Sequence, residues 1–444
     1  MATTQIFFTS SLFGAATLAA AIDSGAFADA DRRLLLVSNN AANPETTPAL
    51  DEMAGFERLR DRFDGLLSWN ETISPFHPGG WAPRGDDVPL WERYLRRLWD
   101  LGDDRIELAV ESIQVNPALA IAQLFPDAAL DVYADGLMSY GPTRNKIDPL
   151  VGERVRRLLH LDLVPGLKPL LLAEFGVQPQ LVPTEAFVKV VGELSDAVPD
   201  ACAGVQEGPA LLLGQYLAAL DILSPAEEEE LHVRMLAGAA ALGHRRIVFK
   251  PHPTAPAAWT RTLERRAESL GVELTVLARP LLAEVLFKQM RPALVVGCFS
   301  TALFTAGTFY GVPVARIGTV PLLDRLTPYQ NSNRVPLTIA DALLPDLAAG
   351  EASTPAHAGE ELAGLLSAVG FAMQSQLRPD LRPAAERFLR TSLDERTARY
   401  FKRRRLTVLG LPGGVPVPRG QVARRVVRRG RRLKRVLKRV AALR

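Results

Sequence analysis

Short apolar runs alternate with segments of helical periodicity along most of the chain. In the first half, buried strands are predicted at residues 5–9, 33–38, 65–69, 106–110 and 130–133. A small-residue helix is predicted directly after the first of these strands. Alternation of this kind is typical of a parallel sheet covered by helices, and it predicts an α/β domain.

The second half shows the same alternation more clearly. Residues 194–208 are polar and small, and they form the predicted interdomain linker. Beyond them, strands are predicted at 210–214, 246–249, 273–277, 293–296 and 314–317, and helices at 226–242, 257–270, 281–290 and 302–310. In doubly wound sheets ligands bind beyond the carboxyl ends of the strands. The residues that follow each strand are therefore the candidates for chemistry.

The pattern divides the chain into four parts. An N-terminal α/β domain is predicted at 1–200, a C-terminal α/β domain at 209–375, helices at 376–410 and a tail at 411–444. A length of 444 residues favours two domains, and the 48% hydrophobic and 23% charged residues are typical of a globular protein. The apolar N-terminus lacks the cationic region of an export signal, so we expect a buried strand there, with a signal peptide as the alternative.

The net charge of +3 hides an uneven distribution. From Arg419 onward the chain holds 12 Lys or Arg and no acid, which leaves 40 basic against 49 acidic residues elsewhere, a net charge of −9. Apolar residues recur at helical spacing among the cations of 421–443. This pattern predicts a basic amphipathic helix that binds an anionic membrane surface. Nucleic acid is a disfavoured rival partner, and a solvated tail is the structural alternative.

Two cysteines, Cys202 and Cys298, are too few and too far apart for a disulfide framework or a CxxC zinc site. We therefore expect a reducing environment. Together with the basic tail, this predicts a cytoplasmic protein that lies peripherally at the inner face of the plasma membrane.

Two strand-end loops of the second half carry candidate phosphate-binding groups. His252 lies between Pro251 and Pro253, which stiffen its loop, and a protonated imidazole could stabilise a departing phosphate or give it a proton. Ser300 and Thr301 stand at the start of a predicted helix, where hydroxyls and free N–H groups bind anions. A solvent-facing loop histidine and simple helix capping are the structural alternatives.

Two acidic residues are further candidates. Asp135 follows a strand and precedes Gly136, so it could take a proton from an acceptor hydroxyl, although Asp-Gly is foremost a turn dipeptide. Glu284 follows Arg279-Pro280 at a helix start, where it could accept both hydroxyls of a ribose or simply stabilise the helix dipole.

Other nucleotide and metal motifs are absent from the sequence. Neither a Walker A motif nor G-x-G-x-x-G occurs. Asp29-Ala30-Asp31 has DxD spacing but precedes a strand. No catalytic metal and no cofactor are therefore expected.

The three strand-end motifs occur in a fixed order across the two predicted lobes: Ala134-Asp135-Gly136, Lys250-Pro251-His252-Pro253 and Ser300-Thr301. Together they resemble the motifs of bacterial sialyltransferases, particularly the polysialyltransferase-like group. The resemblance implies a GT-B fold with two Rossmann-like domains facing an interdomain cleft, an N-terminal acceptor domain and a C-terminal donor domain. It also implies inverting, metal-independent transfer of a nonulosonic acid from a CMP-activated donor to a glycan acceptor, for a cell-surface polysaccharide.

The same resemblance implies a role for each candidate. Asp135 would be the base, His252 would assist departure of the CMP phosphate, and Ser300 and Thr301 would hold that phosphate. The other implied positions are Lys250, Glu284, Gly214 and Gln215 on the donor side and Ser10, Ser11 and Asn39 on the acceptor side. Ala134 departs from the acidic-acidic-Gly pattern and leaves Asp135 as the only carboxylate there.

Two rival functions remain open at this stage. A GT-B transferase or epimerase that uses a UDP- or GDP-sugar would need similar phosphate-binding loops. A non-catalytic adaptor would instead bind a membrane or nucleic acid through the basic tail.

Overall fold

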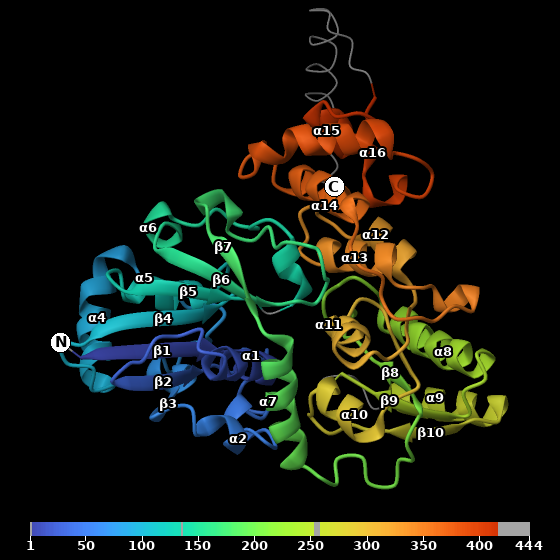
Figure 1. Ribbon diagram of the computed structural model, residues 1–444, viewed down its shortest axis with the longest axis horizontal. Coiled ribbons are helices and arrows are strands. Elements are labelled where there is room, and N and C mark those ends of the chain that lie inside the picture. The colour runs from blue at the N-terminus through green and yellow to red at the C-terminus, as the bar shows by residue number, and fades with distance from the viewer. Residues whose placement is uncertain (1, 135, 253–257, 416–444) are drawn as a thin grey trace, which may run out of the picture.

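The computed structural model describes residues 2–134, 136–252 and 258–415 and contains two parallel sheets (Figure 1). The first sheet has the strand order β3-β2-β1-β4-β5-β6-β7. Its strands are β1 (Thr3–Thr9), β2 (Arg32–Val37), β3 (Gly65–Ser68), β4 (Arg105–Glu111), β5 (Ala129–Tyr133), β6 (Val155–Leu161) and β7 (Gln178–Val182). The chain order reverses direction between β1 and β4, so this pair is the switch point of the sheet.

The second sheet has the order β10-β9-β8-β11-β12. Its strands are β8 (Ala210–Leu213), β9 (Arg246–Lys250), β10 (Glu273–Val276), β11 (Leu294–Gly297) and β12 (Val314–Arg316). Here the switch point lies between β8 and β11. The central strands of both sheets are largely buried; β8 and β11 of the second sheet are apolar, as expected for parallel strands covered on both faces, whereas β1, β4 and β5 of the first sheet also bury polar side chains.

Helices connect the strands and cover the sheets. The first half contains α1 (Leu12–Asp23), α2 (Glu57–Arg60), α3 (Trp69–Thr72), α4 (Val88–Leu98), α5 (Ala118–Leu124), α6 (Pro149–Gly152) and α7 (Thr184–Asp196). The second half contains α8 (Pro225–Ala241), α9 (Ala258–Leu270), α10 (Ala283–Met290), α11 (Thr301–Phe304), α12 (Thr319–Arg325), α13 (Arg334–Leu343), α14 (Glu360–Met373), α15 (Arg382–Thr391) and α16 (Arg403–Leu409). No helix in the described ranges is both long and apolar enough to span a bilayer.

Helix α7 joins the two lobes and packs against α10 of the second. The Lys288 ammonium donates to the carbonyl of Gly192 over 3.2 Å, and the Gln289 amide donates to the carbonyl of Val198 over 2.8 Å. These bonds tie the end of α7 to the domain that follows it. Residues 197–209 then lead from α7 into β8.

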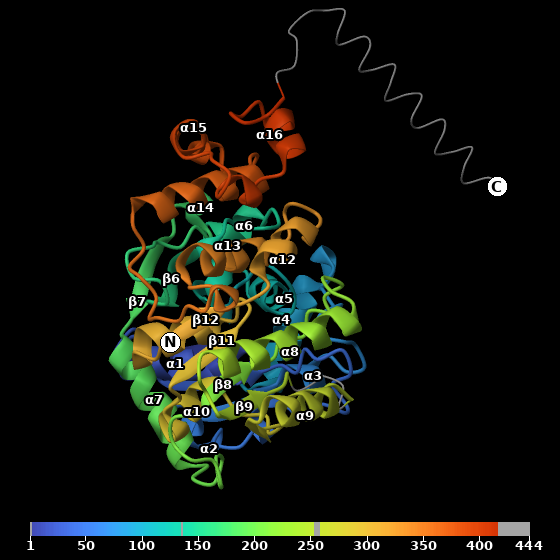
Figure 2. The ribbon, with the colours of Figure 1, turned by 90° about the vertical axis from the view of Figure 1, so that its right-hand side faces the viewer.

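The C-terminal helices return toward the first lobe. Figures 1 and 2 show α14, α15 and α16 together at one end of the molecule. From the end of α14, Gln374 donates to the carbonyl of Arg144, and the Arg378 guanidinium donates to the carbonyl of Leu170 over 3.1 Å. We call this pair of contacts the α14 clasp.

The structure differs from the predicted secondary structure in two places. Strands β6 and β7 were not predicted, and α7 extends to Asp196 inside the expected linker. Each predicted α/β range, 1–200 and 209–375, nevertheless contains one complete sheet.

Candidate functional site

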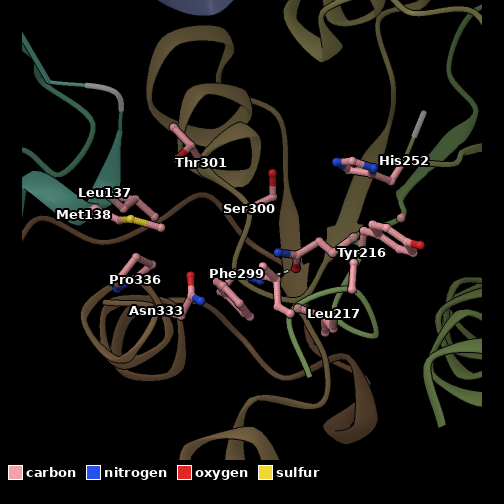
Figure 3. A pocket seen from close by; sticks show the side chains of 14 residues that line it. Leu137, Met138, Tyr216, Leu217, His252, Phe299, Ser300, Thr301, Asn333 and Pro336 are labelled. Atoms are coloured by element: carbon pink, nitrogen blue, oxygen red, sulfur yellow. Dashed lines mark hydrogen bonds between the residues drawn. The ribbon is translucent and has the colours of Figure 1, made fainter. Parts of the chain in front are cut away.

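A cavity of ≈ 400 Å³ lies at the carboxyl ends of β8, β9 and β11, at the switch point of the second sheet (Figure 3). We call it the donor cavity. It is lined by residues 214–217 and 219–220 after β8, His252 after β9, residues 299–301 after β11, residues 137–138 of the first lobe, and Asn333 and Pro336 at the start of α13. None of these described residues is acidic. A cavity of this size suits a small ligand, and none of the lining residues carries a negative charge that would repel an anion.

His252 borders the cavity as its sequence position predicted. Its imidazole stacks on the ring of Tyr216, with centroids 5.5 Å apart and an interplanar angle of 21°. Burial and the positive charge of Lys250 lower the pKa of His252 below its ordinary value of 6.5. The imidazole is therefore mainly neutral near pH 7, and the approach of a phosphate would favour its protonation.

The loop after β8 is held close to β9. The Gly214 amide donates to the carbonyl of Lys250 over 2.9 Å. A Cβ at Gly214 would lie 3.1 Å from the Phe249 ring and 3.2 Å from the Cα of Pro251. Glycine at this position therefore allows the two loops to approach closely.

Gln215 connects the loops of β8 and β11. Its side-chain oxygen accepts a hydrogen bond of 2.9 Å from the backbone amide of Phe299, one residue before Ser300. The side chain thus fixes the position of the hydroxyl-bearing segment. This is a positioning role, and donor binding by Gln215 stays a prediction.

Ser300 and Thr301 lie at the start of the helical segment that follows β11, and both line the donor cavity. The Ser300 hydroxyl accepts a hydrogen bond of 3.3 Å from the backbone amide of Ala302. Ser300 is therefore the N-cap of α11 and a cavity residue at once, and phosphate binding by Ser300 stays a prediction.

Glu228 of α8 supports the other wall of the cavity. It is fully buried, and its carboxylate accepts hydrogen bonds of 2.8 and 2.7 Å from the backbone amides of Leu217 and Ala218. Burial raises the pKa of Glu228, and these two hydrogen bonds oppose the rise. Since Tyr216 precedes this anchored turn, Glu228 holds the residue on which His252 stacks.

The first lobe closes the cavity from the opposite side. Figure 3 shows Leu137 and Met138 on one side and Tyr216 and His252 on the other. A Cβ on Gly136 would lie only 2.6 Å from the Thr301 hydroxyl oxygen, and Gly136 has φ +138. The loop after β5 thus meets the start of α11 directly. Asp135 itself lies outside the described residues.

Lys250 and Glu284 do not line the donor cavity. The Glu284 carboxylate is buried and accepts a hydrogen bond of 2.6 Å from the Thr305 hydroxyl. Burial raises the pKa of Glu284 and lowers that of Lys250, while each charge opposes the shift of the other. This pair is therefore not part of the cavity lining, and ribose binding by Glu284 stays a prediction.

Ser10 and Ser11 follow β1 at the switch point of the first sheet. Both hydroxyls donate to the carboxylate of Glu111 at the end of β4, Ser11 over 3.3 Å. The Ser10 amide donates to the same carboxylate over 3.0 Å. Glu111, which the sequence analysis did not single out, therefore places a carboxylate between the two predicted serines.

Asn39 lies farther along the same sheet edge, beside a second cavity at the ends of β2 and β3. Its side-chain amide donates to the carbonyls of Pro44 and Thr47 over 3.2 and 2.8 Å. The structure therefore groups Asn39 with this second cavity rather than with the donor cavity.

Several donor-cavity residues have no counterpart in the sequence prediction: Leu137, Met138, Tyr216, Asn333 and Pro336. Tyr216 and the pair at 137–138 could have been found by extending the strand-end search by two residues. No cluster of three or more His, Cys, Asp or Glu able to hold a metal occurs in residues 2–134, 136–252 and 258–415. Metal independence stays a prediction.

Two Rossmann-like domains, with a cavity where the loop after β5 meets the strand ends of the second sheet, have the GT-B architecture. Residues 5–319 match the family described as Alpha-2,8-polysialyltransferase (POLYST), and the chain belongs to this family. A search of curated protein sequences finds no significant match.

Solved structures similar to this chain include sialyltransferases. One from Photobacterium damsela is 12% identical and covers 76% of this chain and 78% of its own, with a TM-score of 0.40. A 2,6-sialyltransferase of Vibrionaceae Photobacterium sp. JT-ISH-224, solved with CMP and lactose, is 11% identical and covers 76% and 75%, with a TM-score of 0.39. A UDP-N-acetylglucosamine 2-epimerase is 11% identical and covers 92% and 95%, with a TM-score of 0.40. The assignment of the chain rests on the family match.

Proposed function

We propose that this glycosyltransferase moves a nonulosonic acid from a CMP-activated donor to a glycan acceptor, with inversion and without a metal ion. The convergence of His252, Ser300 and Thr301 on one cavity opposite the loop after β5 carries this proposal. Two strand-end segments that are distant in sequence supply an imidazole, hydroxyls and helix-start amides to one small volume. Groups of these types bind a phosphate without a metal.

The chemistry that we propose requires one base and one stabilised leaving group. Asp135 takes the proton of the acceptor hydroxyl as its oxygen bonds to the anomeric carbon of the donor. The bond between that carbon and the phosphate oxygen breaks, and CMP leaves with its electron pair. His252 donates a hydrogen bond or a proton to that phosphate oxygen, while Ser300 and Thr301 hold the remaining phosphate oxygens.

The low pKa of free His252 gives donor binding a defined pH dependence. A bound phosphate favours the imidazolium form, so CMP binding should take up a proton above the pKa of the free histidine. CMP affinity should therefore increase as the pH falls toward the pKa of the free histidine, which lies below 6.5, and should level off below that pKa.

A panel of nucleotide sugars tests the proposed donor. The protein is incubated with CMP-nonulosonates, UDP-sugars and GDP-sugars, and free nucleotide and product mass are measured. Release of CMP alone, together with an inverted product, is expected. Release of UDP or GDP with no release of CMP would instead establish the rival donor class.

We further propose that the acceptor belongs to a cell-surface polysaccharide and that the enzyme works in the cytoplasm at the inner face of the plasma membrane. The cationic sequence from Arg419 onward supports this proposal through its charge and spacing. It lies outside the described residues. Deletion of residues 416–444 should move the protein from membrane to soluble fractions, and an unchanged distribution would contradict the proposed tail function.

A further inference from the structure

Asn333 presents its side-chain amide to the donor cavity from the start of α13 (Figure 3). It occupies the N-cap position of this helix, yet its side chain makes no capping hydrogen bond. The third helical position is Pro336, which has no N–H group, and the Val335 amide already donates to the carbonyl of Ser332 over 3.4 Å. Within the described part of the chain, the Asn333 side chain has no hydrogen-bond partner. Its amide is therefore available to a ligand.

The turn that carries Asn333 is held on both sides. Next to it, Arg334 is fully buried, and its guanidinium donates to the carbonyl of Tyr329 over 2.9 Å and lies 4.1 Å from the centre of the ring of the same residue. On the other side, the Ser332 hydroxyl accepts a hydrogen bond of 3.0 Å from the Arg144 guanidinium of the first lobe. Because the turn is fixed in this way, little ordering of the backbone is needed when a ligand binds.

Apolar side chains lie beside this amide in the cavity. Met138 of the first lobe and Pro336 of α13 line the same side of the cavity as Asn333, across from His252 and Tyr216 (Figure 3). The 3-10 helix that contains Met138 packs directly on α13. This side of the cavity is therefore a joint surface of the two lobes, with one carboxamide among apolar groups.

The position of this joint surface indicates which part of the donor reaches it. The proposed phosphate site is at Ser300 and Thr301, and a Cβ on Gly136 would lie 2.6 Å from the Thr301 hydroxyl oxygen. The proposed base directly precedes Gly136 in the sequence, so the sugar must be attacked beside this contact. We therefore expect the donor sugar, which is bonded to the phosphate, to lie toward Met138 and Asn333.

A carboxamide among apolar side chains matches an acylamino group better than a charged one. An acylamino group has one N–H donor and one carbonyl acceptor, which a carboxamide can bind at two points, and its alkyl part is stabilised by an apolar surface. A carboxylate would instead need a cation, and the cavity lining, all of it described, contains neither Lys nor Arg.

We propose that Asn333, together with Met138 and Pro336, binds the acylamino group of the donor sugar and selects donors that carry one. Asn333 is then a specificity-determining residue of the transferase. The proposal deepens the proposed function and rests on it.

Donor kinetics with two matched CMP-sugars test this assignment in the full-length protein. One is CMP-N-acetylneuraminic acid, and the other is its analogue with a hydroxyl in place of the acetamido group. Wild-type protein should prefer the acetamido donor. Asn333→Ala should reduce this preference in kcat/KM about tenfold, because only the acetamido group loses binding at two points.

Two controls separate this effect from a loss of structure. The thermal unfolding temperature of Asn333→Ala should equal that of the wild type, since the side chain makes no capping bond. Asn43→Ala changes an exposed asparagine outside the cavity and should leave kcat/KM unchanged for both donors.

Met138→Ala should produce a gain that misfolding cannot mimic. The shorter side chain widens the apolar part of the joint surface, so a donor with an N-butanoyl group should fit better. The ratio of kcat/KM for the N-butanoyl donor to that for the N-acetyl donor should rise about tenfold over the wild type, since two further CH₂ groups are buried. Met53→Ala, a half-buried methionine outside the cavity, should leave the ratio unchanged.

The proposed function and this assignment fail in different ways. If no CMP-sugar releases CMP, the proposed function is wrong. If CMP is released but Asn333→Ala affects the two donors equally, or Met138→Ala leaves the acyl ratio unchanged, the transfer stands and the acylamino site is wrong.

Discussion

The carboxyl-end edges of the two sheets occupy equivalent positions in equivalent folds, yet they carry opposite chemistry. On the second sheet the donor cavity is lined by an imidazole, hydroxyls and an amide, and none of its described lining residues is acidic. On the first sheet the same edge presents Glu111 at the switch point and three more carboxylates beyond it. The parallel sheet decides where a ligand lies, and the residues after each strand decide which charge it carries.

The two edges also differ in how their polar groups are held. On the donor side, side chains bind the backbone of neighbouring loops, as Gln215 does with Phe299 and Glu228 with Leu217. On the first sheet, the Glu111 carboxylate accepts hydrogen bonds from the hydroxyls of Ser10 and Ser11 and also from the Ser10 backbone amide. Both edges thus have a fixed backbone, and the first sheet in addition keeps a carboxylate bound to hydroxyl groups at its switch point.

The largest effects are expected when the proposed base, Asp135, and the residue proposed to assist departure of CMP, His252, are replaced one at a time. The two variants should differ in which step they impair. Asp135→Asn should lower transfer by roughly 10²–10⁴-fold while CMP still binds. His252→Ala should slow CMP release from the donor and also weaken CMP binding. Rapid-quench kinetics and CMP titration measure the two effects. Full turnover by Asp135→Asn would remove this residue from the mechanism.

A smaller change at the contact between the lobes should disturb both edges together. Gly136→Ala places a Cβ 2.6 Å from the Thr301 hydroxyl oxygen at a φ of +138, so the lobes or Thr301 must shift. Misplacement of reacting groups by about 1 Å can cost about 10²-fold in rate. Gly85→Ala is the control, because nothing lies within 4 Å of its added Cβ. Equal kcat in both variants would contradict a tight contact.

An effect confined to the donor edge is expected from Glu228→Gln. The amide retains one acceptor oxygen, so one of the two loop amides loses its partner, and Tyr216 is held less firmly. KM for the donor should rise about tenfold while KM for the acceptor is unchanged. Glu230→Gln, at an exposed position of the same helix, should leave both values as they are. A rise in both KM values would indicate a general loss of structure.

The smallest expected effect is a pH dependence of the free energy of unfolding that comes from the buried His232. His232 is buried between Phe249 and Trp259, neither ring nitrogen has a hydrogen-bond partner, and burial lowers its pKa from 6.5 to about 4. The unfolded chain therefore binds this proton more tightly than the folded protein does. The contribution of neutral His232 to the free energy of unfolding is complete above pH 6.5 and decreases as the pH falls toward 4. The decrease is about 2 kcal/mol between pH 7 and 5.

Denaturant unfolding at several pH values measures this contribution. His232→Leu should flatten the pH dependence of the free energy of unfolding by that amount. The exposed His357→Leu should retain the wild-type slope. An unchanged slope in His232→Leu would mean that other groups dominate acid destabilisation.

The second sheet and its site were largely predictable, because apolar strands of four or five residues alternate with amphipathic helices and place chemistry at strand ends. Strand β7 was missed because this edge strand is mostly exposed and contains Pro179. Strand β6 was missed because Arg156 and Arg157 interrupt its apolar run, and both pair with the buried Asp131.

The limits of the site prediction have a similar origin. A helix-start acid can point to solvent or into the core, and only packing decides that Glu284 turns toward Thr305. Asn333 and Pro336 enter the donor cavity from α13, whose distance in sequence from the strand ends gives no indication of this.

The α14 clasp has a consequence for how substrates come and go. A wide hinge movement between the lobes would break the bonds of Gln374 and Arg378 to first-lobe carbonyls, and Arg378 would lose its buried position. Breaking them leaves polar groups without partners and costs free energy at each turnover. Exchange of CMP for a fresh donor should therefore proceed by small rearrangements at the cavity mouth, with the two halves remaining docked throughout the cycle.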